Sequence, residues 1–143
     1  MLTNLRIENF ILIKKMELEF DKGFSVITGE TGVGKSVLVN AISMLCGKTA
    51  DEGFVRPNSE FAVVEGVFEV DSTNEVFSEF LDKGESQLII YKKIKKGSGS
   101  ITKINNQTVG LKKLKEISLS LINICSQHEH QLLFNKSHQL LLL

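Results

Sequence analysis

Apolar residues alternate with polar ones in two stretches near the start of the chain. The alternating positions are Leu5 and Ile7 in the first stretch and Met16, Leu18 and Phe20 in the second. A period of two places successive side chains on opposite faces, so both stretches are predicted to be strands. The apolar run at residues 24–28 is typical of a strand buried on both faces. A glycine-containing turn at residues 21–23 predicts that the strands flanking it pair as neighbours.

Helical spacing replaces this alternation after a group of glycines. The apolar positions of the segment 35–45 are Val37, Leu38, Ala41, Ile42 and Leu45. Their spacing of three or four residues predicts an amphipathic helix with one apolar stripe. Gly47 follows the stripe and is suited to end the helix, because glycine tolerates the left-handed backbone of a C-cap.

The middle of the chain predicts a strand, a helix and a hairpin. Residues 61–70 are rich in β-branched and aromatic side chains and predict a strand. Residues 74–81 predict a helix whose apolar stripe consists of Val76, Phe77, Phe80 and Leu81. Residues 88–95 and 100–104 flank the sequence KKGSGS, which indicates a β-hairpin.

The last part of the chain predicts shorter elements. Asn105 and Asn106 indicate a second tight turn, and residues 121–125 (LINIC) are typical of a buried strand. A short helix with lysines on its outer face is predicted between them from Leu111, Leu114, Ile117 and Leu121. Residues 137–143 have the composition of a helix that has just begun. We see no internal repeat or linker, and 143 residues suffice for one domain with a core.

The composition is that of a folded protein, with 42% hydrophobic and 24% charged residues. Charges interrupt the first residues every few positions, so we expect no signal peptide. The apolar runs are much shorter than a membrane span, so we expect no membrane partner. Cys46 and Cys125 lie in apolar surroundings without a CxxC pair, which favours reduced thiols and a cytoplasmic location.

Charge is distributed unevenly although the net charge is zero. Residues 51–85 hold ten acidic side chains against Arg56 and Lys83, whereas residues 86–115 hold eight lysines and no acid. Such a basic segment is typical of a surface that follows a DNA backbone. The alternative is that the lysines, among them Lys92, Lys93, Lys95 and Lys96, simply face the acidic segment. The sequence leaves both interpretations open.

The residues GETGVGKS at 29–36 match the phosphate-binding pattern G-x-x-x-x-G-K-[ST]. Gly29 and Gly34 let the backbone curl so that successive N–H groups point at phosphate oxygens. Lys35 supplies a point charge for the β- and γ-phosphates, and the Ser36 hydroxyl is a ligand for Mg²⁺. The helix that follows directs its positive dipole end at the same anion. An apolar run before the loop and an amphipathic helix after it favour nucleotide binding over a simple turn.

Hydrolysis needs a further carboxylate, at the end of a second buried strand, to hold Mg²⁺ and position water. Asp71 is the nearest match, but Glu65 and Glu69 give its strand one polar face, which is a poor fit to a central strand. The run 121–125 ends in Cys125 and Ser126, without an acid. We therefore predict that the chain binds a nucleotide and does not hydrolyse it alone.

Residues 5–47 resemble the N-terminal ATPase segment of the SMC-like branch of the ABC superfamily. Within that branch, the stretches 29–36, 55–68, 104–117 and especially ICSQHEHQLL at 124–133 are similar to bacterial ATPases of DNA double-strand-break repair. The resemblance implies an α/β P-loop NTPase fold with an ABC/SMC-like head. Its N-terminal lobe would have mixed and antiparallel strands around the P-loop helix.

The resemblance also implies how the chain is organised. Residues 1–136 would form the N-terminal half of the head, from the P-loop to the Q-loop, and residues 137–143 the start of a truncated helical arm. A C-terminal half would supply the ABC signature and the Walker B acid, and two heads would enclose two ATP molecules. The implied partners are DNA at double-strand-break ends, the C-terminal half, a second head in a homodimer and a recombinase. The implied location is the cytoplasm, at the nucleoid.

Site residues follow from the same resemblance. ATP would bind to Gly29, Glu30, Thr31, Gly32, Val33, Gly34, Lys35 and Ser36. Lys35 and Gln127 would act in catalysis, with Ser36 and Gln127 directed to the Mg²⁺ of the nucleotide. Ser126 occupies a position where the family often has glycine, so Gln131 is the alternative for the Q-loop residue.

Three other interpretations were weighed. A zinc site from Cys125, His128 and His130 lacks a second pair of ligands. A GTPase would need aspartate at His138, after Asn135. A small-molecule kinase is the main alternative function, but its lid would be rich in arginine, and the chain has only two arginines.

Overall fold

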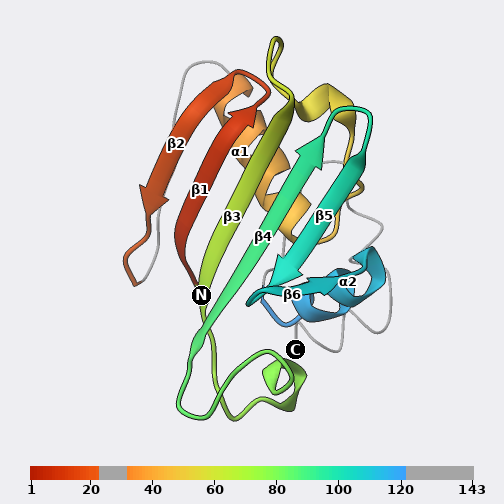
Figure 1. The fold of residues 1–143 in the computed structure, drawn as a ribbon. Coiled ribbons are helices and arrows are strands. Elements are labelled where there is room, and N and C mark those ends of the chain that lie inside the picture. Colours follow the sequence, from red (N-terminus) through yellow and green to blue (C-terminus); the bar gives the residue numbers. More distant parts are fainter. Residues whose placement is uncertain (23–31, 122–143) are drawn as a thin grey trace, which may run out of the picture.

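The computed structural model describes residues 1–22 and 32–121, which form one sheet with two helices against one of its faces (Figure 1). The strands are β1 (Leu2–Phe10), β2 (Ile13–Glu19), β3 (Phe61–Glu69), β4 (Gln87–Lys95), β5 (Gly99–Ile104) and β6 (Gln107–Val109). The helices are α1 (Gly32–Leu45) and α2 (Leu111–Ser118), with the short 3-10 turns η1 (Glu52–Phe54) and η2 (Glu75–Phe77). The elements predicted at 24–28 and 137–143 lie outside the described residues, as does the strand predicted at 121–125 except for Leu121, and so does the proposed boundary after residue 136.

The sheet has the strand order β2-β1-β3-β4-β5-β6, and every neighbouring pair in it is antiparallel. The two alternating stretches of the sequence are confirmed as strands that pair with each other. Leu5 lies opposite Leu18, and Ile7 lies opposite Met16, so their apolar side chains share one face. The pairing predicted across the turn at 21–23 involves residues that the structure does not describe.

β3 is a central strand, although the sequence analysis judged it unsuited to that place. It pairs with β1 on one side and β4 on the other. Its polar face is accommodated because an antiparallel sheet can pack one face on the core and leave the other in water. Glu65 on that outer face forms an ion pair with Arg6, 3.3 Å away. A central strand needs two apolar faces in a parallel sheet, whereas an antiparallel sheet such as this one does not require them.

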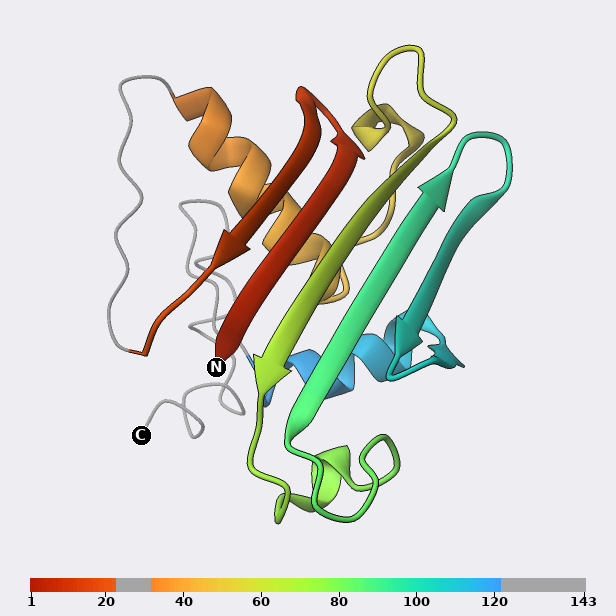
Figure 2. The same cartoon turned by 60° about the vertical axis from the view of Figure 1, so that its left-hand side comes forward.

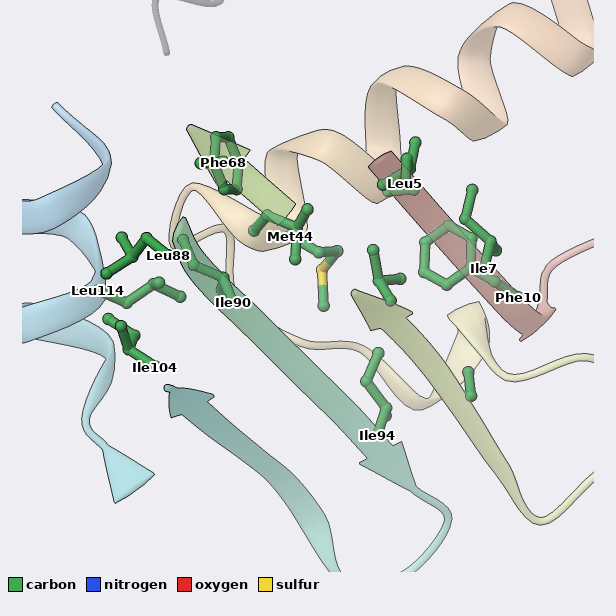
Figure 3. Packing of buried hydrophobic residues seen from close by; sticks show 14 of the residues in the cluster. Leu5, Ile7, Phe10, Met44, Phe68, Leu88, Ile90, Ile94, Ile104 and Leu114 are labelled. Carbon is green, nitrogen blue, oxygen red and sulfur yellow. The ribbon is translucent and has the colours of Figure 1, made fainter. Parts of the chain in front are cut away.

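The hydrophobic core lies between the sheet and the two helices (Figures 2 and 3). Met44 of α1 and Leu114 of α2 are both fully buried in it. From the strands, the core contains Leu5, Ile7, Phe10, Ala62, Val64, Phe68, Leu88, Ile90, Ile94 and Ile104. Because α1 and α2 share this face, the opposite face of the sheet carries no described helix, and we call it the open face.

α1 begins at Gly32, three residues before the predicted start, and ends as predicted near Gly47. Gly47 has φ +96°, and the amide of Lys48 donates to the carbonyl of Ser43 at 3.0 Å. This is the glycine-ended C-cap that the sequence indicated. A second glycine brings the helix close to the sheet, because a Cβ on Gly66 of β3 would lie 2.6 Å from Leu45 Cδ1.

Both predicted turns of the hairpin region are confirmed. β4 and β5 pair through the turn that contains Gly97, with Lys95 opposite Gly99. Asn105 and Asn106 have φ of 44° and 68° and join β5 to β6. Asparagine is among the residues that adopt this left-handed conformation most readily.

The helix predicted at 74–81 is wrong. The chain forms only the 3-10 turn η2, and Val76 is 40% exposed, while Phe77 and Phe80 are buried. The Asn74 side chain accepts a hydrogen bond from the Val76 amide, and the Ser78 hydroxyl donates to the Glu75 carbonyl. Such local side-chain contacts compete with helix formation, and an eight-residue helix is too short to prevail by propensity.

Candidate nucleotide-binding site

The first turn of α1 carries the part of the phosphate-binding motif that the structure describes. Gly34, Lys35 and Ser36 are exposed there, while Val37 and Leu38 begin the buried side of the helix. No acidic residue lies in this turn. The free amides and the helix dipole give the turn a positive potential, and Lys35 adds a full charge. The turn therefore has the chemistry of an anion site.

Gly34 supports this assignment independently of charge. A Cβ at this position would meet no described atom within 4 Å, so packing inside the described chain does not require glycine here. Its backbone is also helical, without the positive φ that favours glycine. A glycine that neither packing nor backbone requires is suited to close approach by a ligand. The residues present fit a nucleotide phosphate with its Mg²⁺.

The opposite end of α1 is fixed by side chains from β4 and α2. Lys92 Nζ donates to the carbonyl oxygen of Lys48 at 3.2 Å. Ser118 Oγ donates to the carbonyl oxygen of Cys46 at 3.0 Å. The Cys46 carbonyl is the first after the last helical residue, Leu45, and is one of those that a helix end leaves without a helical partner, whereas the Lys48 carbonyl lies just beyond the helix. The Lys92 ammonium also complements the negative end of the dipole. The phosphate-binding turn is thus the start of a helix whose end is anchored to two other elements.

Lys92 fits neither interpretation of the lysines at residues 86–115, because it does not lie at the surface. Its side chain is 1% exposed and lies on the core side of β4, between Ile90 and Ile94. Burial lowers the pKa of Lys92, and the nearby charge of Lys115 lowers it further. The sequence alternation indicates this burial, because position 92 falls on the same face of the strand as the apolar positions 88, 90 and 94. The neighbouring lysines made position 92 look like part of an exposed basic segment.

The attraction between the acidic and basic segments is confirmed at one contact. Lys113 of α2 forms an ion pair with Glu79, and this contact raises the pKa of Lys113. The Lys113 ammonium also lies 5.9 Å from the ring centroid of Phe80. The α2 lysines lie on the outer side of the helix as predicted, and one of them, Lys113, forms an ion pair with the acidic segment.

Asp71 does not approach the phosphate-binding turn. Its carboxylate accepts hydrogen bonds from the amide and hydroxyl of Thr73, at 2.9 and 2.6 Å, and these bonds lower the pKa of Asp71. The segment that follows β3 lies at one end of the sheet, and the first turn of α1 lies at the other (Figure 2). This agrees with the expectation that Asp71 is not the catalytic acid.

Several predicted site residues lie outside the described ranges. They are Gly29, Glu30, Thr31, Cys125, Ser126, Gln127, His128, His130 and Gln131. Gly32 and Val33 are described only as the first backbone positions of α1. Within residues 1–22 and 32–121, no group of three His, Cys, Asp or Glu side chains is placed to hold a metal ion. No helix in the described part of the chain is long and apolar enough to cross a membrane.

The fold is that of an SMC-type ATPase head. A chain solved in a study of ATP-driven dimerization and DNA-stimulated activation of SMC ATPases matches with a TM-score of 0.69 and 18% identity, covering 99% of this chain and 96% of that one. The SMC head domain from Thermotoga maritima matches with a TM-score of 0.61 and 20% identity, over 80% of this chain and 41% of its own. The recombination mediator RecF matches with a TM-score of 0.65 and 23% identity, over 80% of this chain and 29% of the RecF chain. The predicted ABC/SMC-like fold class is confirmed.

The family model described as AAA domain matches residues 4–141, and the chain belongs to this family. It is also similar to DNA repair protein RecN of Bacillus subtilis, with 34% identity over 147 residues that include the whole chain. RecN of Vibrio cholerae is 36% identical over the same extent. In both cases the chain spans 26% of the relative's length. These matches confirm the resemblance to bacterial DNA repair ATPases found in the sequence.

Proposed function

We propose that this chain is the ATP-binding N-terminal part of a DNA repair ATPase that acts in recombinational repair of double-strand breaks. The observation that carries the proposal is the first turn of α1, where Lys35 and Ser36 are exposed at the positive end of an anchored helix. The similarity to RecN, whose name states a role in DNA repair, supports the biological setting. The proteins named above are DNA repair proteins, SMC proteins and a recombination mediator, and none is a small-molecule kinase.

We assign the residues of the site as follows. The backbone amides of residues 29–34 would surround the phosphates, with Glu30, Thr31 and Val33 as the variable positions of the loop. Lys35 would hold the β- and γ-phosphates, and the Ser36 hydroxyl would hold Mg²⁺. Gln127 would lie near the metal and orient the attacking water. When bound, Mg²⁺ neutralises charge on the phosphates during transfer.

The chain alone is proposed to bind ATP without hydrolysing it. The first turn of α1 contains no acidic residue, and the Asp71 carboxylate is hydrogen-bonded to Thr73. The missing groups would come from the C-terminal half and from a second head in a homodimer. DNA ends and a recombinase are the further proposed partners, and the proposed location is the cytoplasm, at the nucleoid.

Calorimetric titration of the 143-residue chain with Mg-ATP tests the proposal. We expect saturable binding at one site per chain, weakened when Mg²⁺ is chelated. The absence of binding heat and of competition with a fluorescent ATP analogue would contradict the assignment.

A further inference from the structure

The lysines of β4 and β5 divide between the two faces of the sheet. Successive side chains of a strand point to opposite faces, so Lys92 faces the core while Lys93 and Lys95 lie on the open face. Lys103 of β5 lies opposite Tyr91 and therefore shares the open face. Figure 1 shows this face, with β4 and β5 on the side away from β2. We call Lys93, Lys95 and Lys103 the open-face lysines.

Strands β4 and β5 supply positive charge to the open face and no negative charge of their own. β4 and β5 contain no acidic residue, and the facing acid of β3, Glu65, forms an ion pair with Arg6. Among the described residues, none of the open-face lysines forms an ion pair. The Lys93 ammonium lies over the ring of Phe61, 4.6 Å from the ring centroid, and this cation–π contact helps to position it.

Acidic side chains gather instead at one end of the open face. A groove of about 870 Å³ there is lined by Glu65, Glu79, Asp82 and Glu85, and it also contacts Lys103. Near the other end, Glu52 accepts a hydrogen bond from the Gly97 amide of the β4–β5 turn. An anionic partner would therefore be favoured over Lys93 and Lys95 and disfavoured over the acidic part of the groove, and Lys103 lies where these two regions meet.

We propose that the open-face lysines contact the phosphate backbone of duplex DNA. This inference rests on the proposed role in DNA repair, which makes DNA the anion of interest. Lys93 and Lys95 are two residues apart on one strand and thus about 6.7 Å apart, with Lys103 on the neighbouring strand. Ile101, 51% exposed, lies opposite Lys93 on the same face. Contacts from lysine side chains to phosphates carry no sequence information, so we expect binding that does not depend on DNA sequence.

The test compares three triple variants of the full 143-residue chain by fluorescence anisotropy with a labelled duplex of about 30 base pairs. K93Q/K95Q/K103Q removes the three charges, and K93R/K95R/K103R keeps them. K22Q/K83Q/K112Q removes three exposed lysines located elsewhere and is the matched control. Each phosphate contact contributes about 0.9 to the slope of log affinity against log salt, so the first variant should lose about 2.7. The parent's affinity should then fall about 40-fold more than the variant's between about 50 and 200 mM salt.

The arginine variant and the control should keep the parent's slope, and duplexes of unrelated sequence should bind equally. An unchanged slope in K93Q/K95Q/K103Q, an equal loss in the control, or no duplex binding by the parent would overturn the inference. So would binding of a glutamate-rich peptide that needs the same lysines while duplex DNA does not bind, because it would indicate a protein partner. Thermal unfolding and Mg-ATP titration of each sample separate the outcomes. If the parent binds ATP but the salt slope is unchanged in K93Q/K95Q/K103Q, only the proposed DNA surface is contradicted. If the parent does not bind ATP, the proposed function is contradicted.

Discussion

Lys92 Nζ lies 3.2 Å from the carbonyl oxygen of Lys48 and donates a hydrogen bond to it, which joins β4 to the end of α1. The contact places a buried lysine at one end of the helix whose other end carries Lys35. One lysine therefore has a structural role on the core side, and the other is exposed for a ligand. Their surroundings, and not their chemistry, distinguish them.

The buried position of Lys92 predicts a pH dependence of stability. Burial lowers the pKa in the folded state below the ordinary value of 10.5, so the unfolded chain binds more protons between the two pKa values. The free energy of unfolding of the parent should therefore rise relative to that of Lys92→Met as the pH increases through this window. Below the folded-state pKa, the difference between the two proteins should be constant.

Urea unfolding of the parent and Lys92→Met at several pH values between neutrality and 10.5 measures this difference. Lys95→Met is the control, since Lys95 is exposed on the other face of the same strand. Parallel curves for the parent and Lys92→Met would show that Lys92 is not held in an environment that disfavours its charge.

Lys35→Ala should weaken Mg-ATP binding by a factor of roughly ten or more. A hydrogen bond to a charged group contributes about 1.5–3 kcal/mol, and each 1.4 kcal/mol corresponds to tenfold in affinity. The thermal unfolding midpoint should hardly change, because Lys35 is exposed. Calorimetry provides the measurement, with Lys83→Ala as an exposed control outside the motif. Equal affinity in Lys35→Ala and the parent would exclude the phosphate-binding assignment.

Ser36→Ala should differ from Lys35→Ala in its dependence on the metal. The hydroxyl is proposed to act only through Mg²⁺, so its removal should weaken binding in the presence of Mg²⁺ and have little effect when the metal is chelated. Titrations with and without Mg²⁺ compare the two variants. The same loss of affinity under both conditions would mean that Ser36 contacts the phosphates directly.

The isolated chain should release no phosphate from ATP above background. Asp71 is the only carboxylate that the sequence offered for the catalytic role, and its hydrogen bonds to Thr73 hold it in a local turn. Phosphate release by the parent, Asp71→Asn and Lys35→Ala should therefore be indistinguishable. Turnover by the parent that both substitutions abolish would show that Asp71 reaches the nucleotide.

Asn105→Ala should lower the free energy of unfolding by about 2 kcal/mol, as expected for several partly exposed hydrogen bonds lost together. The Asn105 side chain accepts from the Ile89 amide at 2.7 Å and donates to the carbonyls of Phe80 and Gln87. Its φ of 44° is also unfavourable for alanine. Urea unfolding measures the effect.

Asn105→Gly separates the two causes, because glycine accepts the backbone conformation but makes none of the side-chain bonds. Asn106→Gly is the control at the neighbouring position, where φ is 68°. If Asn105→Gly is as stable as the parent, the side-chain hydrogen bonds do not contribute and the backbone alone explains the alanine variant.

Local patterns in the sequence were sufficient wherever neighbouring residues determine the structure. The alternation at Leu5 and Ile7, the glycine that ends α1 and the paired asparagines at 105 and 106 each predicted the element that is observed. The motif at 29–36 predicts an anion site, because the chemistry of such a site depends on consecutive residues. Gly34, Lys35 and Ser36 are found exposed at the start of α1, as that motif requires.

Tertiary structure decided what depends on partners distant in sequence. β3 is central because β1 and β4 supply strands on both sides, and its polar face is tolerated because these neighbours are antiparallel. Lys92 is buried because the end of α1 offers it a carbonyl 44 residues away, whereas Lys93 is left on the open face. The predicted apolar stripe of residues 74–81 does not form because the core buries Phe77 and Phe80 and leaves Val76 40% exposed. Composition and periodicity assign each residue a tendency, but the environment that decides its charge state or burial comes from segments that meet only in the folded chain.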